Sequence, residues 1–521
     1  MSGAATTALV VGVLAGVVAL ARWLRVSQRE HYLPGACTAT ARLWVRVRPP
    51  NAIVLVAGAA GAVVALAAGA TTLGSAAAIV AAVAGAAFPV PMTVLGREVH
   101  LRLTRRAVVL GAIALLGAVV LCAVAIPFGR GAVAPGVVAI AMAVVVDLAA
   151  AVAAPIERRL LERHRRRAAA KLAAIAPTVI AVTGSWGKTS TKNHIRDLLA
   201  GAVATVASPA SFNNTAGISI TINEHMGPDC RVLVAELGTF GPGEIRALCA
   251  WLRPEVAVIT AIGPMHLERM GTLDAIAAAK AEITETARDV VLWVDDPRLA
   301  DLAERLPGKR VWRVGTAAPD GAPFATTRPL DVSVLTVDGT TTVFQGEARV
   351  GAYAASPGVH AGNVGCAVAA ALAIGIDVRL LADPLARLST TDHRGTLGRS
   401  DRGVWVIDDT FNSNPAGASA ALAELRRAGA GGRRAVVTPG MVELGSMQDD
   451  ANRSFAHEAR DAEATLVIVG WTNRRALRAG AGDDAHVVEV RDRAAAREWV
   501  RATLADGDAV LWENDLPDHY P

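Results

Sequence analysis

The sequence predicts an α-helical membrane region followed by two α/β domains, and three observations support this fold class. Long apolar runs fill the first 156 residues. From about residue 171 onward, short apolar runs alternate with helical stretches, a pattern typical of a mostly parallel sheet covered by helices. A Gly-rich loop follows the first of these short runs and opens a helix, as phosphate-binding loops do. A chain of 521 residues is long enough for all three parts.

The N-terminal region, residues 1–156, carries five apolar and nearly uncharged runs. They span residues 4–20, 52–68, 74–90, 107–128 and 132–155, and each approaches the ~20 residues that a membrane-spanning helix needs. These runs explain a hydrophobic content of 52% and a mean hydropathy of +0.37, which are too high for a wholly soluble protein. We therefore expect about five transmembrane helices in contact with a lipid bilayer.

Arginine is concentrated on one side of these runs. Between the first and second runs lie Arg22, Arg25, Arg29, Arg42, Arg46 and Arg48, and between the third and fourth lie Arg97, Arg102, Arg105 and Arg106. A further basic segment, residues 158–167, follows the fifth run, whereas the opposite loops hold only Arg130. The positive-inside rule then places the N-terminus outside and everything after residue 156 in the cytoplasm, as a multi-pass protein of the cytoplasmic (inner) membrane.

The formal charge of +5 and the pI near 9.2 come largely from these basic flanks. Contact with anionic lipid headgroups accounts for them, and the lack of a basic patch with interleaved aromatic residues argues against nucleic acid as a partner. Five scattered cysteines without Cys-x-x-Cys spacing indicate reduced thiols. Asp147, inside the fifth run, is either a functional carboxylate within the membrane or one partner of a helix–helix hydrogen bond.

The remainder of the chain is predicted to form two α/β domains, at residues 172–388 and 389–521. Buried strands are expected at residues 231–235, 256–262, 290–294, 404–407, 435–438 and 465–469, with a helical stretch at 272–288. Residues 331–350 alternate in polarity around Asp338-Gly339, which predicts a hairpin appended to the first sheet. The alternation of strands and helices favours mostly parallel sheets in both domains.

The loop that follows the first strand is predicted to bind the phosphates of ATP. It reads Gly184-Ser185-Trp186-Gly187-Lys188-Thr189-Ser190. The glycines let backbone amides and a helix N-terminus face an anion, Lys188 adds a positive charge, and the Thr189 hydroxyl is a ligand for Mg²⁺. Val182 stands where the usual Walker spacing requires glycine, so the loop departs from the general motif. A plain strand-to-helix turn is the alternative interpretation.

Several ordered motifs between residues 175 and 506 resemble those of the Mur ligases, and are most similar to the branch that adds D-alanyl-D-alanine to the peptidoglycan precursor. The short phosphate loop matches that of the family. The further motifs lie at residues 211–217, 236–245, 262–268, 279–283, 408–415 and 440–445. The resemblance implies a Mur-ligase-like central P-loop ATPase domain, a C-terminal Rossmann-like domain, and amide bond formation with ATP and Mg²⁺ as cofactors.

By this resemblance, Thr189, Glu236 and His266 are metal ligands, and Lys280 is a carbamylated lysine that bridges to Mg²⁺. A carbamate turns a cation into an additional oxygen ligand, which suits the hard Mg²⁺ ion. Without the resemblance, Lys280 and Glu282 read as exposed helix residues and His266 as a histidine in a core, and these alternatives stay open. The implied catalytic residues are Lys188, His266, Lys280 and Arg394.

The resemblance implies nucleotide contacts at three further positions. Asn363 aligns with the first asparagine of the family's His-Asn-x-x-Asn element, and Cys366 replaces the second. Arg394 corresponds to the phosphate-contacting arginine of the interdomain linker, with Arg399 as a rival. Asp409 lies in the motif that follows. We therefore expect Arg394 and Asp409 to reach ATP from the C-terminal domain.

Substrate contacts are implied at Asn213, Asn214, Asn412 and Asn414. Two departures from the family leave the substrates open: the helical region stands where the family carries its UDP-sugar-binding domain, and residues 511–521 replace a Lys-Gly-Ser-Arg turn. Membrane anchorage favours a carboxylate acceptor that is lipid-linked or a growing envelope polymer, as in the related poly-γ-glutamate synthetases. The amine is expected to be an amino acid or a short peptide.

The sequence thus predicts a membrane-anchored ligase that works through an acyl phosphate. Two other interpretations stay open. In the first, a degenerate ligase domain serves as a nucleotide-binding scaffold for a partner subunit of a membrane complex; in the second, the ATP-binding domain energises a transporter. The retained Lys188, Glu236, His266 and Lys280 argue against the scaffold, and the lack of an ABC-type signature argues against the transporter.

Overall fold

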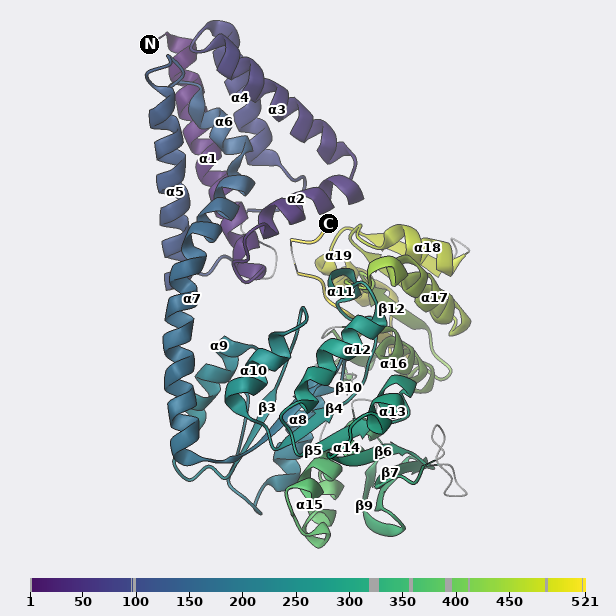
Figure 1. Cartoon of the computed structure of the whole chain (residues 1–521). Coiled ribbons are helices and arrows are strands. Elements are labelled where there is room, and N and C mark those ends of the chain that lie inside the picture. Colours follow the sequence, from purple (N-terminus) through teal and green to yellow (C-terminus); the bar gives the residue numbers. More distant parts are fainter. Residues whose placement is uncertain are drawn as a thin grey trace. The chain divides into compact units, whose positions relative to one another are not determined.

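A computed structural model describes residues 2–94, 96, 100–317, 328–355, 359–388, 396–410, 413–482, 486–517 and 519–521 (Figure 1). The chain divides into two compact units. The first comprises Met1–Leu160 with Gly470–Thr472 and Leu516–Pro521, and the second comprises Leu161–Val469 and Asn473–Asp515. Helices build the first unit, and the second unit holds both sheets.

Apolar helices dominate the described part of the first unit. They are α1 (Gly3–Arg29), α2 (Ala36–Val47), α3 (Pro50–Ala68), α4 (Thr72–Ala87), α5 (Arg105–Ala125), α6 (Ala134–Ile140) and α7 (Met142–Ile175), which continues into the second unit. Among the described residues, α1, α3 and α5 are long and apolar enough to cross a membrane, and the bent pair α6 and α7 would make a fourth span. Crossing of a membrane itself stays a prediction from length and composition.

The helical unit differs from the five predicted spans at two places. The third predicted span is α4, which has 16 residues, or about 24 Å of helix against a hydrocarbon core of about 30 Å. Its apolar run continues into Pro89 and Pro91, which do not extend a helix. The fifth predicted span is broken between α6 and α7, whose axes differ by 76°.

The carboxylate of Asp147 binds the N-terminus of α2. Its Oδ1 accepts a hydrogen bond from the backbone N–H of Cys37 (3.1 Å), and its Oδ2 accepts one from the N–H of Thr38 (2.9 Å). The first amides of a helix have no partner within the helix, and a negative charge there also meets the positive end of the helix dipole. The geometry therefore supports the helix–helix contact rather than a functional carboxylate.

The last residues of the chain also belong to the first unit. The ring Nε2 of His519 lies 2.8 Å from Glu30 Oε1, and the His519 carbonyl accepts a hydrogen bond from the Trp44 indole (2.8 Å). His519 and Trp44 are both buried. His519, near the end of the segment that departs from the family, therefore packs against α2 and the end of α1.

A nine-stranded sheet forms the first domain of the second unit, in the order β2-β3-β1-β4-β5-β6-β7-β8-β9. The strands are β1 (Thr178–Thr183), β2 (Thr205–Ala207), β3 (Val232–Glu236), β4 (Val256–Ile259), β5 (Asp289–Trp293), β6 (Arg310–Thr316), β7 (Val332–Val337), β8 (Thr340–Gln345) and β9 (Ala348–Ala354). Strands β1 to β7 pair in parallel, whereas β7, β8 and β9 pair antiparallel. The predicted hairpin is β7–β8, with Asp338 and Gly339 at positive φ in its turn.

Side chains alternate between the two faces of the sheet along each strand. Both faces carry apolar residues, and helices cover both faces. Ile180 and Val182 of β1 pack with α8 (Lys188–Leu199) and α14 (Ala361–Ala373), whereas Val179 and Ala181 pack on the opposite face. The remaining helical elements are α9 (Thr215–Ile220), η1 (Thr221–His225), α10 (Glu244–Leu252), α11 (Leu267–Met270), α12 (Leu273–Ala281), η2 (Glu282–Thr284), α13 (Pro297–Glu304), η3 (Val378–Leu380) and α15 (Ala382–Ala386). The helix predicted at 272–288 is therefore α12 followed by a 3-10 turn.

A six-stranded sheet forms the C-terminal domain, in the order β10-β11-β15-β12-β13-β14. Its elements are β10 (Thr396–Arg399), β11 (Trp405–Asp409), α16 (Pro415–Ala428), β12 (Arg434–Thr438), η4 (Gly445–Met447), α17 (Gln448–Asp461), β13 (Ala464–Val469), α18 (Arg474–Ala481), β14 (Val487–Val490), α19 (Arg493–Thr503) and β15 (Ala509–Glu513). Among the described strands of this sheet, only β10 pairs antiparallel with its neighbour. The predicted α/β class is confirmed for both domains.

Replacement of Asp147 by alanine should lower the thermal stability of the full-length protein in detergent. Two amides of α2 lose their acceptor, and loss of a helix cap typically costs about 1 kcal/mol. Asp147→Asn keeps an acceptor oxygen and serves as the control. An alanine variant that unfolds at the wild-type temperature would show that Asp147 has no structural role.

Candidate active site

The phosphate loop connects the carboxyl end of β1 to the first turn of α8. Gly187 lies in the left-handed region (φ +79°) directly before α8, and a Cβ atom there would come within 2.2 Å of the side-chain oxygen of Asn363. Gly184 has a φ of +153°, and a Cβ atom on it would lie 2.0 Å from Thr260 Oγ1. Only glycine fits at these two positions. The predicted loop is therefore shaped by close contacts from α14 and from the residue after β4.

Hydrogen bonds fasten this loop to the segment that leads to His266. The Ser185 hydroxyl donates to the carbonyl of Gly263 (3.0 Å) and accepts from its N–H (2.9 Å), and the Ser185 N–H donates to the Ala261 carbonyl (2.8 Å). The indole of Trp186 fills the space that a Cβ atom on Gly263 would occupy. Ser185 and Trp186 thus hold the loop in place with their side chains.

Two lysines converge on the carbonyl oxygen of Gly184. Lys188 Nζ donates to it at 2.7 Å, and Lys280 Nζ donates to it at 3.0 Å. Lys280 is buried, and this burial together with the charge of Lys188 lowers the pKa of its ammonium group well below the usual value. The interpretation of Lys280 as an exposed helix residue is therefore wrong. The charge of Lys188 beside a turn of backbone amides favours an anion as ligand.

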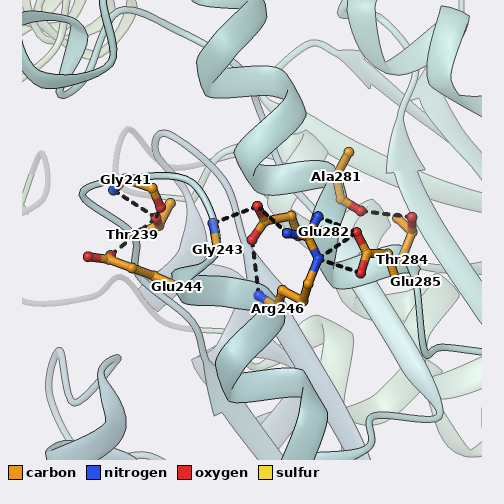
Figure 2. Close-up of polar contacts among 9 residues, drawn as sticks. All are labelled: Thr239, Gly241, Gly243, Glu244, Arg246, Ala281, Glu282, Thr284 and Glu285. Carbon is orange, nitrogen blue, oxygen red and sulfur yellow. Dashed lines mark hydrogen bonds and ion pairs between the residues drawn. The ribbon is translucent and has the colours of Figure 1, made fainter.

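Glu282 fixes the end of α12 that carries Lys280. Its carboxylate accepts hydrogen bonds from the backbone N–H groups of Gly243 (2.7 Å) and Arg246 (3.0 Å), at the start of α10 (Figure 2). The guanidinium group of Arg246 also pairs with Glu285 at 2.7 Å. Glu282 is buried, so it too is not the exposed helix residue of the alternative interpretation. These contacts join the helix of Lys280 to the loop that follows β3.

Glu236 ends β3 beside the phosphate loop, because it pairs in register with Val182 of β1. Its Oε1 accepts a hydrogen bond from Asn213 Nδ2 (3.2 Å), and Lys192 Nζ lies 3.4 Å from its Oε2. The Lys192 and Glu236 side chains are only 1% and 2% exposed. The structure thus brings together two predicted site residues and adds a buried lysine.

His266 lies directly before α11 and contacts the C-terminal domain. Its Nδ1 is 2.6 Å from Oε2 of Glu443, and both residues have a φ of +63°. Such left-handed backbone at a residue other than glycine costs about 1–3 kcal/mol and is concentrated at functional sites. The ring of Phe240 packs edge-on against the imidazole, with 5.0 Å between centroids. An imidazole whose Nδ1 is bound to a carboxylate presents its Nε2 to a ligand.

Of the predicted Mg²⁺ ligands, only Glu236 and His266 are of the His, Cys, Asp or Glu types. No group of three His, Cys, Asp or Glu side chains that could hold a metal ion is found in the described part of the chain. A Mg²⁺ ion that enters with a nucleotide needs only one or two protein carboxylates, because phosphate oxygens and water complete its octahedron. Glu236, the last residue of β3, and the hydroxyl of Thr189, in the first turn of α8, fit such a site. Mg²⁺ there would neutralise phosphate charge.

Asn363 is the predicted nucleotide residue whose position the described structure supports most directly. It lies in the first turn of α14, against Gly187 of the phosphate loop. Cys366, one turn further along α14, is buried in the hydrophobic core. The first asparagine of the family element is thus present beside the loop, and the second is replaced by a core residue.

The structure describes only some of the residues that were predicted to contact ATP from the interdomain linker and β11. Arg394 lies outside the described residues. Its rival Arg399 donates to Asp506 (2.7 Å) and to the Gly403 carbonyl (3.0 Å), so it stabilises the β10–β11 hairpin. Asp409 is the last residue of β11, beside Glu513 of β15.

Two of the predicted substrate asparagines are helix caps. Asn214 Oδ1 accepts a hydrogen bond from the N–H of Gly217 (2.9 Å) at the start of α9, and Asn414 Oδ1 accepts one from Gly417 (3.0 Å) at the start of α16. Asparagine is among the preferred N-cap residues. Asn412 lies outside the described residues, and Asn213 contacts Glu236.

Glu513 is a buried carboxyl group at the end of β15. The hydroxyl groups of Ser413 and Thr438 donate hydrogen bonds to it. Burial raises the pKa of Glu513 to about 7, and the nearby Asp409 acts in the same direction. Glu513 therefore links the segment before α16 to the end of β12.

Sequence analysis did not identify Lys192, Glu443 or Glu513 as site residues. Lys192 follows Lys188 by one helical turn, and this spacing on one helix face was the available signal. Glu443 lies 177 positions from its partner His266, and Glu513 lies 100 positions from Ser413. Contacts across such separations leave no local pattern.

Comparison with known families matches this arrangement of domains. The family model described as Mur ligase middle domain matches residues 182–371. The model described as Mur ligase, glutamate ligase domain matches residues 393–513. Together the two matches include more than half of the chain.

Individual proteins are also similar to this chain over its two α/β domains. The chain is 32% identical over 382 residues to the UDP-N-acetylmuramoyl-tripeptide–D-alanyl-D-alanine ligase of Mycobacterium leprae, with 67% of this chain and 73% of that protein covered. It is 26% identical over 342 residues to the ligase of the same name from Escherichia coli, with 64% and 74% covered. The solved MurF ligase from Thermotoga maritima in complex with ADP superposes with a TM-score of 0.56 at 23% identity, with 68% and 80% covered.

Replacement of Glu513 by glutamine should flatten the pH dependence of stability. Because the pKa of Glu513 is raised from 4.5 to about 7 in the folded chain, the free energy of unfolding falls as the pH rises through this range. The loss is on the order of 3 kcal/mol at most. Thermal unfolding of the full-length protein at pH 5 and pH 7.5 measures the effect, and equal pH slopes for variant and wild type would refute it.

Proposed function

The chain belongs to the Mur ligase family, whose members are ATP-dependent ligases that form peptide bonds, and we propose that it joins an amino acid or short peptide to a carboxylate acceptor of the cell envelope. In this reaction the acceptor carboxylate attacks the γ-phosphate of ATP, which gives an acyl phosphate and ADP. The amine then displaces phosphate through a tetrahedral intermediate. The names of the relatives support a muramoyl-peptide type of acceptor and a D-alanyl-D-alanine type of amine.

The observation that carries the proposal is the convergence of Lys188 and Lys280 on the Gly184 carbonyl oxygen. A bound polyphosphate offers Lys188 a stronger partner than this carbonyl, since a charged acceptor binds an ammonium group more tightly. The charge of Lys188 then offsets the negative charge of the transferring phosphoryl group. The amides at the start of α8 act on the same phosphates.

The loop that contains Asn213 is our candidate for holding the acceptor. This loop is tied to the end of β3 by the bond of Asn213 to Glu236 and by the N–H of Gly238, which donates to the Asn213 carbonyl (2.8 Å). The loop therefore presents its backbone next to the phosphate site. The contact between His266 and Glu443 supports closure of the C-terminal domain on the same site, which excludes water from the acyl phosphate.

We also propose that Lys280 carries a carbamate. Its lowered pKa leaves the amine neutral at a pH where ordinary lysines are charged. A neutral amine attacks CO₂, forms the N–C bond and releases one proton, which gives a carbamate oxygen ligand for Mg²⁺ at the end of α12. The contact of Glu282 with α10 keeps this end in place.

Our proposals for the acceptor and for the location of the enzyme are based on the helical unit. The length and hydropathy of α1, α3 and α5 support a multi-pass anchor. The arginine-rich segments at their flanks support an inner-membrane location with the catalytic domains in the cytoplasm, where ATP is available. We propose that the acceptor is carried by a lipid or an envelope polymer. A water-soluble nucleotide-linked acceptor, as in the names of the relatives, is the competing outcome of the test.

The test is release of phosphate by the detergent-solubilised full-length protein with Mg-ATP and a panel of amino acids and dipeptides. One arm contains a membrane lipid extract and the other a UDP-linked muramoyl peptide. We expect amine-dependent release in the lipid arm, and a fall in kcat of at least about 100-fold in Lys188→Ala. Release only in the nucleotide-linked arm would refute the membrane-borne acceptor, and no amine-dependent release in either arm would favour the scaffold.

The carbamate gives a separate prediction. Protein equilibrated with ¹³C-bicarbonate should show a carbamate carbon resonance that is absent from Lys280→Arg, because arginine stays protonated. Lys309→Arg, a substitution directly before β6 and outside the site, is the control. Identical spectra for the wild type and Lys280→Arg would exclude a carbamate on Lys280.

A further inference from the structure

Lys192 is a buried lysine that the proposed reaction does not use. It lies on α8 one helical turn after Lys188, so both side chains leave the same face of the helix near its N-terminus. Its side chain is 1% exposed. A lysine buried to this extent keeps its charge only when that charge is compensated, so the partners of Lys192 matter.

The ammonium group of Lys192 has two identified partners. Its Nζ donates to the carbonyl of Ala210 (2.5 Å) and lies 3.4 Å from Oε2 of Glu236. Ala210 has a φ of +44°, in the left-handed region that residues other than glycine seldom adopt. The contact thus ties α8 to the loop between β2 and α9 (residues 208–214), which we call the acceptor loop, at a strained position. It also ties α8 to the end of β3.

The ammonium group of Lys192 lies at the carboxylate of Glu236 where a metal cation would bind. One carboxylate oxygen accepts from Asn213 and the other faces Lys192, and the carboxylate is 2% exposed. A second cation at this carboxylate must displace or repel the ammonium group, and burial makes the repulsion larger than it would be in water. Glu236 in this state is therefore a poor ligand for a free Mg²⁺ ion.

A nucleotide changes this balance. Its phosphates bring several negative charges to a site where Lys188 contacts the phosphate loop and Lys192 lies close to the carboxylate of Glu236. With these phosphates present, a divalent cation and the lysine can both be accommodated. Before they arrive, the lysine alone neutralises Glu236.

We propose that Lys192 is an internal counterion of Glu236 that keeps Mg²⁺ out of the empty site, so that the metal enters together with ATP. This inference rests on the proposed ATP-dependent reaction. In this role Lys192 is a positioning residue for the acceptor loop and for the metal ligand Glu236. This role also explains why the described residues form a site that is complete only with a nucleotide.

The experiment measures Mn²⁺ binding to the full-length protein by electron paramagnetic resonance, with and without ADP. Wild-type protein should bind Mn²⁺ weakly alone and tightly with ADP. Lys192→Met, which removes the charge but keeps an unbranched side chain, should bind Mn²⁺ without ADP at least about tenfold more tightly than the wild type. Lys192→Arg keeps the charge and should behave as the wild type does.

Thermal unfolding gives a second readout in the same samples. Because Lys192→Met leaves Glu236 buried without its cation, Mn²⁺ alone should raise the unfolding temperature of this variant more than that of the wild type. Lys192→Gln retains a donor for the Ala210 carbonyl. It replaces the methionine variant if that variant does not fold.

The outcomes separate this inference from the proposed function. If the wild type binds Mn²⁺ tightly with ADP but the uncharged variants bind it no more tightly without ADP, Lys192 is not a competing cation and the inference is wrong. If ADP does not promote Mn²⁺ binding to the wild type, the nucleotide–metal site of the proposed function is wrong, and the inference falls with it.

Discussion

Two ammonium groups on one carbonyl oxygen are the constraint around which the catalytic part of this protein is arranged. Lys188 comes from the helix that begins at the phosphate loop, and Lys280 comes from the end of α12, yet both donate to Gly184. Burial lowers the pKa of Lys280, and repulsion from the nearby charge of Lys188 acts in the same direction. An anion relieves the repulsion, so the architecture is set for a phosphate group.

The rest of the site holds these two lysines in place. Ser185 fixes the loop to Gly263, and Glu282 fixes the end of α12 to the start of α10. Lys192 then connects α8, the helix of Lys188, to Glu236 and to the acceptor loop. Parallel strands bring their carboxyl ends to one edge of the sheet, which is why residues from distant segments meet there.

Much of the fold could be predicted because its signals are local. The phosphate loop needs glycine at 184 and 187, and both glycines are required by contacts that the structure shows. The hairpin at Asp338-Gly339 has positive φ at both residues of its turn. Five apolar runs were visible in the sequence, but the shortness of α4 and the break before α7 depend on how the helices pack.

The site was only partly predictable for a related reason. The resemblance to the Mur ligases implied Glu236, His266 and Lys280, but not their partners Lys192 and Glu443, because a buried ion pair depends on side chains that meet only after folding. The resemblance also implied substrate contacts at Asn214 and Asn414, whose side-chain oxygens cap α9 and α16. Asparagine serves both purposes, and the sequence does not distinguish them.

The most direct test of the account is an experimental structure of the full-length protein in detergent with Mg-ADP. The account predicts that the nucleotide phosphates lie against the amides of residues 184–188, that Lys188 Nζ turns from the Gly184 carbonyl to a phosphate oxygen, and that Glu236 faces the metal. A nucleotide bound elsewhere, with Lys188 still on the Gly184 carbonyl, would contradict it.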